Sequence, residues 1–205
     1  MLKLKFDEKG LIPVIAQDYR TGEVRMLAWA NEEAIRKTLE TGYAHYYSRS
    51  RQKIWKKGES SGELQKVKEV RVDCDEDTVI YIIEQEKNKA CHTGERNCFY
   101  RSIDARKVTK PLPFEVLQRL QEVIKERLEK KTENSYTVKL VEKGKERVFQ
   151  KFGEESVETL IALLKGNKEE IVYETADMLY MLLVSLEING IDIKEVMEEL
   201  IKRFK

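Results

Sequence analysis

Apolar and polar residues alternate along much of the first half of the chain, whereas apolar residues recur every three or four positions in the second half. A period of two is typical of strands, and a spacing of three and four is typical of helices. The pattern therefore predicts a β-rich α+β domain followed by an all-α domain. Two of the three prolines, Pro111 and Pro113, lie where the period changes and favour a linker there. We expect domains over residues 1–107 and 114–205, joined by residues 108–113.

The first half is predicted to contain several short strands and one helix. A turn at residues 20–22 joins the first two apolar runs into a hairpin. Asn31 is a helix-capping residue, two glutamates follow it in the first turn, and Gly42 ends the helix. The predicted strands cover residues 11–17, 23–29, 43–48, 65–72, 78–84 and 98–103.

The second half is predicted to consist of helices that bury apolar stripes. The first stripe contains Leu117, Leu120, Ile124 and Leu128. Further helices are expected over residues 134–141, 147–165 and 169–188, and Asp192 caps a last one. In the helix over residues 147–165, the side chains expected to face inward are Val157, Leu160, Ile161 and Leu164.

Composition narrows the classes of protein to consider. Charged residues make up 37% of the chain, but the formal net charge is +1, which argues against general binding to nucleic acids or membrane surfaces. No apolar run reaches the length of a membrane span, and the N-terminal residues lack the apolar core of a signal peptide. Three cysteines are an odd number, which fits a reducing cytoplasm better than a secreted disulfide framework. We therefore expect a cytoplasmic protein whose clustered thiols bind metal or take part in catalysis.

Three aspartates spaced two apart follow the strand predicted over residues 65–72. If that strand continued, Asp73, Asp75 and Asp77 would present carboxylates on one face, and Cys74 would present its thiol on the other. Closely spaced carboxylates repel one another unless a cation such as Mg²⁺ lies among them. The alternative is a solvated acidic turn, and the aspartates alone do not decide between the two.

The three cysteines, Cys74, Cys91 and Cys98, offer three thiolates to a zinc ion. A structural zinc site closes with four protein ligands, whereas a catalytic site often has three and keeps a position for water. Three thiols therefore favour a hydrolytic zinc, and His92 is either a fourth ligand or a general base. The alternatives are a buried core thiol at Cys74, two incidental cysteines and an exposed loop histidine.

The segment over residues 48–62, SRSRQKIWKKGESSG, is basic and polar and is a candidate phosphate site. Arginine binds phosphate through two N–H groups, lysine supplies a point charge, and backbone N–H groups of a Gly-Ser loop can join them. The alternative is an edge strand whose charges prevent aggregation. The candidate phosphate-binding residues are Arg49, Arg51, Lys53, Lys56, Lys57, Ser60 and Ser61.

Acidic residues of the second half lie on two consecutive predicted helices. Glu154, Glu155 and Glu158 share a face of one helix, and Glu174 and Asp177 share a face of the next. Antiparallel packing would bring the five together, and Mg²⁺ held by such carboxylates commonly serves the phosphates of a substrate. An ordinary charged face is the alternative for the first helix, but Asp177 lies in an apolar run where an unpaired carboxylate is costly. The candidate phosphate contacts upstream are Arg147 and Lys151.

Several of these segments resemble known enzyme families. A resemblance to phosphoribosyl-AMP cyclohydrolase is carried by GLIPVIAQDYRTGEVRMLAWANEEA, SRSRQKIWKKGESSGELQKV, VDCDED and ACHTGERNCFYR. A resemblance to phosphoribosyl-ATP pyrophosphohydrolase, one of the all-α nucleotide pyrophosphohydrolases with an ExxE…ExxD motif, is carried by NSYTVKL, FQKFGEESVE and YETADMLYMLL. Fused in this order, the segments resemble the bifunctional enzymes of histidine biosynthesis over nearly the whole chain.

The resemblance implies metal ligands and reactions. Asp73, Asp75 and Asp77 would bind Mg²⁺, and the three cysteines would bind Zn²⁺ in a site shared by two subunits of a homodimer. The helical domain would bind a further Mg²⁺ and release pyrophosphate from phosphoribosyl-ATP. Zinc-activated water would then attack C6 of the adenine ring and open the N1–C6 bond. The implied Mg²⁺ ligands of the helical domain are Glu154, Glu155, Glu158, Glu174 and Asp177, and the candidate catalytic residues are His92, Glu155 and Glu158.

Three other functions compete with this interpretation. A zinc nucleobase deaminase also attacks C6 of adenine, but it needs HxE and PCxxC motifs, and the chain contains neither. A general nucleoside triphosphate pyrophosphatase with a structural zinc module would explain the helical half alone. A zinc-stabilised binding module would unfold on zinc removal and show no turnover. Incubation with phosphoribosyl-ATP, with pyrophosphate and ring opening followed separately, distinguishes them.

Overall fold

Strand β1 (Ile12–Asp18) shows the alternation on which the strand predictions depend. Its residues are alternately buried and partly exposed along its whole length. Strand β1 pairs antiparallel with β2 (Val24–Ala30) and parallel with β6 (Val79–Gln85), so it lies inside a mixed sheet. Its buried face, Ile12, Val14 and Ala16, belongs to the core of the first half.

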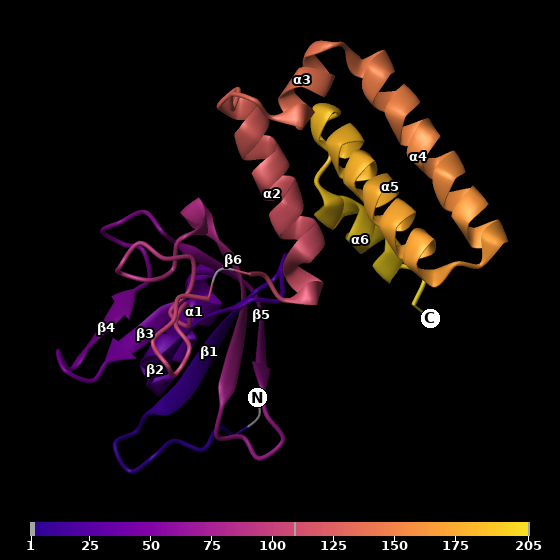
Figure 1. The fold of residues 1–205 in the computed structure, drawn as a ribbon. Coiled ribbons are helices and arrows are strands. Elements are labelled where there is room, and N and C mark those ends of the chain that lie inside the picture. Colours follow the sequence, from indigo (N-terminus) through magenta and orange to yellow (C-terminus); the bar gives the residue numbers. More distant parts are fainter. Residues whose placement is uncertain (1–2, 109, 205) are drawn as a thin grey trace. The chain divides into compact units, whose positions relative to one another are not determined.

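The computed structural model describes residues 3–108 and 110–204, and the chain separates into two compact units, Met1–Lys110 and Pro111–Lys205 (Figure 1). The boundary between the units falls within the linker predicted over residues 108–113. Residue 109 of that linker, like residues 1–2 and 205 of the two predicted domains, lies outside the described residues.

Six strands form the sheet of the first unit, in the order β4-β3-β2-β1-β6-β5. The remaining strands are β3 (His45–Ser48), β4 (Lys53–Lys56) and β5 (Gln65–Val72). An isolated bridge joins Tyr43, just before β3, to Lys66 on β5, so the sheet curves round on itself into a half-barrel. The rings of Tyr46 and Tyr81 meet in its interior with centroids 5.7 Å apart.

Helix α1 (Glu32–Thr41) begins and ends where the sequence predicts. The side chain of Asn31 accepts a hydrogen bond from the Ala34 N–H, and Gly42 adopts a left-handed conformation with φ 71°. Glycine takes this conformation without the steric cost of a Cβ atom. The short 3₁₀ helix η1 (Glu86–Asn88) follows β6 and begins the segment over residues 86–98, which contains Cys91 and Cys98 and is called the cysteine segment below.

The strand predicted over residues 98–103 is wrong. Cys98 donates its backbone N–H to the Arg25 carbonyl oxygen, and Arg101 forms only an isolated bridge to Lys107. The aromatic residues in this segment suggested a strand. However, their backbone follows turns outside the sheet, because the hydrogen bonds between Ser102 and Arg106 close a local loop.

Helices make up the second unit, as predicted. Ser135 caps α3 (Tyr136–Glu142) by accepting a hydrogen bond from the Val138 N–H, and Asp192 caps the last helix, α6 (Ile193–Ile201). The predicted stripe of α2 is confirmed, because Ile124 is fully buried and Leu117, Leu120 and Leu128 pack against the same core. The helices are η2 (Pro113–Glu115), α2 (Val116–Glu129), α3 (Tyr136–Glu142), α4 (Lys145–Lys165), α5 (Lys168–Ile188) and α6 (Ile193–Ile201).

The inward face predicted for α4 is wrong for the single chain. The buried residues of α4 are Val148, Glu155, Thr159 and Ala162, which turn toward the rest of the unit. The predicted apolar stripe lies elsewhere on the helix, and its exposed fractions are 54% for Val157, 59% for Leu160, 46% for Ile161 and 88% for Leu164. Figure 1 shows α4 and α5 side by side, with α4 at the outside of the unit. The helical unit by itself thus leaves an apolar stripe of α4 uncovered.

Within the part of the chain that the structure describes, no helix has the length and hydrophobicity to cross a bilayer.

Candidate metal and substrate sites

The carboxylates of Asp73, Asp75 and Asp77 gather in the turn between β5 and β6, each within 4.8 Å of the others. The strand ends before them, so the turn rather than strand alternation brings them together. Asp73 accepts hydrogen bonds from the N–H groups of Asp77 and Thr78, both at 3.0 Å. Desolvation alone would raise the pKa of Asp73, but these hydrogen bonds hold it below its usual value. The turn therefore presents exposed carboxylate oxygens, which suit a hard cation.

The thiols of Cys91 and Cys98 lie within hydrogen-bonding reach of one another. Desolvation raises the pKa of Cys98 to about 11, and the adjacent Cys91 adds to the rise. Desolvation acts on Cys91 in the same direction, but the Thr93 hydroxyl donates to its Sγ at 3.0 Å and holds the pKa of Cys91 below its usual value. The imidazole Nδ1 of the exposed His92 lies 4.0 Å from the same sulfur. This pair of soft ligands with a nearby imidazole is suitable for zinc.

Cys74 does not join the other two thiols. Cys98 is hydrogen-bonded to Arg25 on β2, whereas Cys74 lies in the turn between β5 and β6, and β5 is three strands from β2 in the sheet order. Figure 1 shows the β5–β6 turn at the lower end of those strands. Among the described residues, the groups of three or more potential ligands within 4.8 Å are one of aspartates and one of glutamates, and neither contains a cysteine. One chain therefore does not assemble a three-thiol site.

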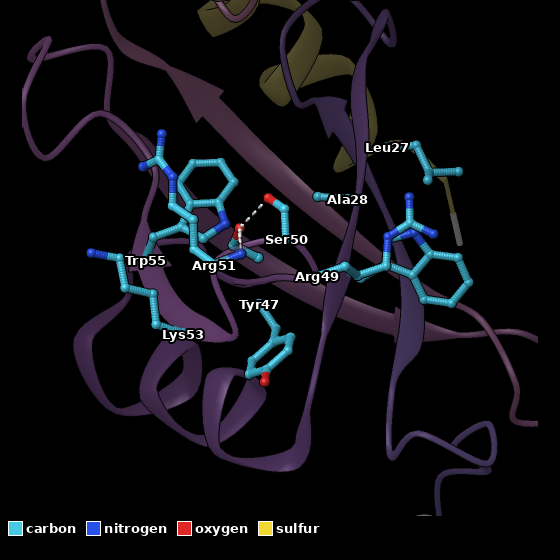
Figure 2. A pocket seen from close by; sticks show the side chains of 10 residues that line it. Leu27, Ala28, Tyr47, Arg49, Ser50, Arg51, Lys53 and Trp55 are labelled. Carbon is cyan, nitrogen blue, oxygen red and sulfur yellow. Dashed lines mark hydrogen bonds between the residues drawn. The ribbon is translucent and has the colours of Figure 1, made fainter.

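A cavity of about 430 Å³ opens beside the turn between β3 and β4 (Figure 2). The Arg49 guanidinium lies 4.9 Å from the ring centroid of Trp29, and the Arg51 N–H donates to the Ser48 hydroxyl. Cations over aromatic faces are suited to bind the phosphates and the base of a nucleotide together. The lining residues that carry this character are Arg49, Arg51, Lys53, Trp29, Tyr47 and Trp55.

The rest of the basic segment lies away from this cavity. Lys56 Nζ lies 4.1 Å from the Tyr43 ring centroid, and the buried Lys57 is close enough to both thiols to lower their pKa values. The turn at residues 58–62, with Ser60 and Ser61, approaches the cysteine segment instead, because Lys87 Nζ donates to the Ser61 carbonyl oxygen at 2.9 Å. Three of the five predicted cations thus line the cavity.

A second acidic group joins α4 to α5 in the helical unit. Carboxylate oxygens of Glu155, Glu158 and Glu174 lie within 4.8 Å of one another. The hydrogen bond and the charge of Glu155 raise the pKa of Glu158, because two carboxylates this close do not ionise independently. A divalent cation would relieve this repulsion, so the group is suitable for Mg²⁺.

The other predicted acids lie at the edge of this group. Glu154 pairs with Arg147 at 3.0 Å, and Lys151 Nζ lies 2.5 Å from Glu155 and 3.6 Å from Glu154. Asp177 follows Glu174 by one turn of α5 and is half-buried rather than enclosed by apolar residues. Of the five predicted acids, the structure gathers three closely.

Comparison with known proteins identifies both halves. Residues 26–100 match the family model described as phosphoribosyl-AMP cyclohydrolase, and residues 117–204 match the one described as phosphoribosyl-ATP pyrophosphohydrolase. The histidine biosynthesis bifunctional protein HisIE of Aquifex aeolicus (strain VF5) is 80% identical over 205 residues, which cover 100% of both chains. The chain belongs to the HisIE family.

Other HisIE proteins are similar over almost their full length. That of Pyrococcus furiosus is 50% identical over 96% of this chain and 92% of its own, and that of Thermotoga maritima is 47% identical over 95% and 98%. This HisIE chain is a bifunctional hydrolase of histidine biosynthesis, with a cyclohydrolase half before a pyrophosphohydrolase half. A general nucleoside triphosphate pyrophosphatase with a structural zinc module does not fit, because the cyclohydrolase model matches the first half.

The sequence did not reveal two features of the HisIE cyclohydrolase half. The aromatic side chains that line the cavity, Trp29, Tyr47 and Trp55, come from three strands, and only Trp55 lies in the basic segment. Two carboxylates and an arginine of the β1–β2 hairpin form a buried ionic cluster beside the cysteine segment, although nothing in their spacing marks them as buried. Only the aromatic residues had a signal, because Tyr47 and Trp55 lie on either side of the basic turn.

Proposed function

We propose that the chain acts as a homodimer in which Cys91 and Cys98 of one subunit and Cys74 of the other bind one zinc ion. The observation that carries this proposal is the separation within one chain, where two thiols are adjacent and the third lies across the sheet. A two-fold axis pairs each cysteine segment with the turn of the other subunit, so the dimer would contain two complete sites.

The chain's own residues then carry out ring opening. A zinc ion bound by thiolates supplies a water whose pKa lies near neutrality. The oxygen of a water bonds to C6 of the N1-substituted adenine, the N1–C6 bond breaks, and a proton reaches N1. His92, exposed beside Cys91, is the candidate proton carrier.

The cavity beside β3 and β4 would hold the nucleotide. Arg49, Arg51 and Lys53 supply the positive charge for phosphate, and Trp29 and Trp55 supply faces for the base. Lys57, beside the thiols, would act nearer the reacting ring, and Ser60 and Ser61 border the cysteine segment. Mg²⁺ at Asp73, Asp75 and Asp77 would neutralise the phosphate charge.

The helical half would release pyrophosphate at the acidic group of α4 and α5. Mg²⁺ at Glu155, Glu158 and Glu174 would bind the triphosphate, with Glu154 and Asp177 at its border. A water attacks the α-phosphorus, the α–β bridging bond breaks, and pyrophosphate leaves. Because Lys151 and Arg147 already lie against these carboxylates, they are the nearest cations for the departing phosphates.

The uncovered stripe of α4 supports self-association of the helical unit. Contiguous exposed apolar side chains are uncommon on monomers and mark contact surfaces. A second copy brings an identical stripe, and a two-fold contact is self-complementary.

The three free thiols further support a reducing cytoplasm as the location. Small phosphoribosyl nucleotides are the proposed partners, and the balanced charge supports neither nucleic acid nor membrane.

Mixing inactive variants tests the shared zinc site. Cys74→Ala and Cys91→Ala each remove a thiol from both sites of their own dimer, so each alone should not open the ring. After subunit exchange at equal amounts, half the dimers are mixed and each has one complete site, so about one quarter of wild-type ring opening should return.

A mixture of Cys91→Ala with Cys98→Ala is the matched control. Both variants lack a thiol of the same segment, so no exchange of subunits restores a site. Activity in this control, or none in the first mixture despite proven exchange, would contradict a site shared between subunits.

A further inference from the structure

Arg25, at the start of β2, is almost completely buried, with an exposed fraction of 2%. Four of its N–H groups donate hydrogen bonds. The Nε and one Nη2 N–H donate to Asp18 at 3.0 and 2.8 Å, and Nη1 forms an ion pair with Glu23 at 3.0 Å. The other two hydrogen bonds reach the cysteine segment, at the Asn88 side chain (3.0 Å) and the Arg96 carbonyl oxygen (3.3 Å).

Glu23 makes a second set of bonds between the same two parts of the chain. Its carboxylate accepts from Arg96 Nε at 2.6 Å and from the Asn97 side-chain amide. The N–H of Cys98 itself donates to the Arg25 carbonyl oxygen at 2.8 Å. The β1–β2 hairpin therefore bonds to the segment at residues 88, 96, 97 and 98, on both sides of Cys91 and next to Cys98.

Asp18 holds the hairpin side of this cluster in place. Its Oδ1 accepts from the N–H groups of Arg20 and Thr21 and from the Thr21 hydroxyl, while its Oδ2 receives Arg25. The Asp18 carboxylate is thus hydrogen-bonded to both the hairpin turn and Arg25. In contrast, the segment's own hydrogen bonds are local, such as Cys91 N–H to Glu95 and Gly94 N–H to Cys91.

Stability alone does not explain such a cluster. Burying ion pairs costs desolvation that their attraction barely offsets, and apolar residues of similar size often stabilise as well or better. What the cluster provides is a fixed geometry, because a planar guanidinium with four hydrogen bonds and an ion pair fixes its partners in angle as well as distance.

We propose that Arg25, with Asp18 and Glu23, positions the cysteine segment so that Cys91 and Cys98 hold the spacing and orientation that zinc requires. The inference rests on the proposed zinc site. Arg25 does not touch the metal or substrate, so it is a positioning residue of the kind whose loss typically weakens metal binding by about 10- to 100-fold.

Zinc affinity of the full-length protein, measured by competition with a chromophoric chelator, tests this proposal. The main variant combines Arg25→Met with Asp18→Asn, which removes both charges together so that neither remains buried alone. Asn88→Ala and Asn97→Ala remove single contacts on the segment and leave the sheet untouched. The matched control is Arg36→Met, because Arg36 forms an exposed ion pair with Glu40 on α1.

The expected result is zinc binding weakened about 10- to 100-fold in the double variant and several-fold in each asparagine variant, with unchanged pyrophosphate release. The thiolate-to-cobalt absorption of the cobalt-substituted protein should shift in the same variants. Arg36→Met should match the wild type in both measurements. Should the double variant unfold, the two asparagine variants decide the question.

Zinc affinity within about twofold of the wild type in correctly folded variants, with an unchanged cobalt spectrum, would overturn the positioning role. A wild-type protein that binds no zinc through its cysteines gives a different result, since it overturns the proposed zinc site itself.

Discussion

At the scale of single residues, two adjacent thiols differ in how readily they ionise. The Thr93 hydroxyl lowers the pKa of Cys91, whereas desolvation and Cys91 raise that of Cys98 to about 11. If the proposed zinc site forms, both thiols bind as thiolates, and Cys98 is the one whose deprotonation costs more.

Removing Cys91 should separate the two reactions. Cys91→Ala should reduce ring opening to the uncatalysed level and leave pyrophosphate release unchanged, because the thiols and the acidic group of α4 and α5 lie in different units. Glu158→Gln should do the reverse. Pyrophosphate and ring opening are followed separately with phosphoribosyl-ATP, and loss of both activities in either variant would contradict two independent sites.

A buried tyrosine predicts how stability depends on pH. Desolvation raises the pKa of Tyr81 to about 12, from an ordinary value near 10. The folded state favours the neutral phenol, so its contribution is complete below about pH 10 and is lost as pH rises through about 12. The wild type should lose roughly 2–3 kcal/mol of unfolding free energy over this range that Tyr81→Phe does not lose, as measured by urea unfolding. Equal losses in both proteins would contradict this.

At the scale of elements, periodicity identified most helices and strands but not what covers them. Strand β5 has the predicted bounds, although a bulge between Val67 and Glu69 shifts its alternation, and β4 lies in the basic segment, where no strand was predicted. The stripe of α4 has the period of a buried helix, yet Leu164 is 88% exposed in one chain. A period of 3.6 residues specifies an apolar face, but it does not tell whether that face meets its own chain or another.

A charge on this stripe should weaken the dimer. Leu164→Glu removes about 1.5–3 kcal/mol of apolar burial from each subunit if the stripe is covered, so the dissociation constant should rise at least about tenfold. Sedimentation equilibrium measures the dissociation constant of the dimer. Phe204→Glu is the control, because Phe204 is 84% exposed but lies beyond α6. Equal dissociation constants for the two variants would exclude this stripe from the interface.

The candidate sites were predictable in part. Residue types and spacing indicated two acidic groups, and the structure gathers carboxylates at both, in the β5–β6 turn and between α4 and α5. The local backbone and neighbouring ion pairs, however, determine which of the predicted carboxylates lie close together. The aspartates gather in a turn rather than along a strand, and Glu154 turns to Arg147 instead of joining Glu155. The role of Arg25 depends on contacts with residues more than sixty positions away, which no local pattern encodes.

At the scale of the whole molecule, one chain combines two hydrolytic activities, and its two halves carry different kinds of potential metal ligand. The helical unit gathers carboxylates, whereas the first unit has carboxylates and thiols. The two activities should therefore respond differently to metals, because hard and soft ligands select different ions.

Chelation followed by single-metal addition tests this difference. A chelator should stop both reactions, Mg²⁺ should restore pyrophosphate release, and ring opening should need zinc as well. Both products are measured after each addition. Restoration of pyrophosphate release by zinc alone would contradict the assignment of Mg²⁺ to the helical half.

The position of Cys74 across the sheet from the other two thiols has a consequence for flux. If each zinc site needs two chains, the number of complete sites follows mass action. When association is weak, halving the chain concentration reduces complete sites to about one quarter. In a cell that expresses little of this enzyme, the rate of ring opening would then fall more steeply than the concentration of the chain.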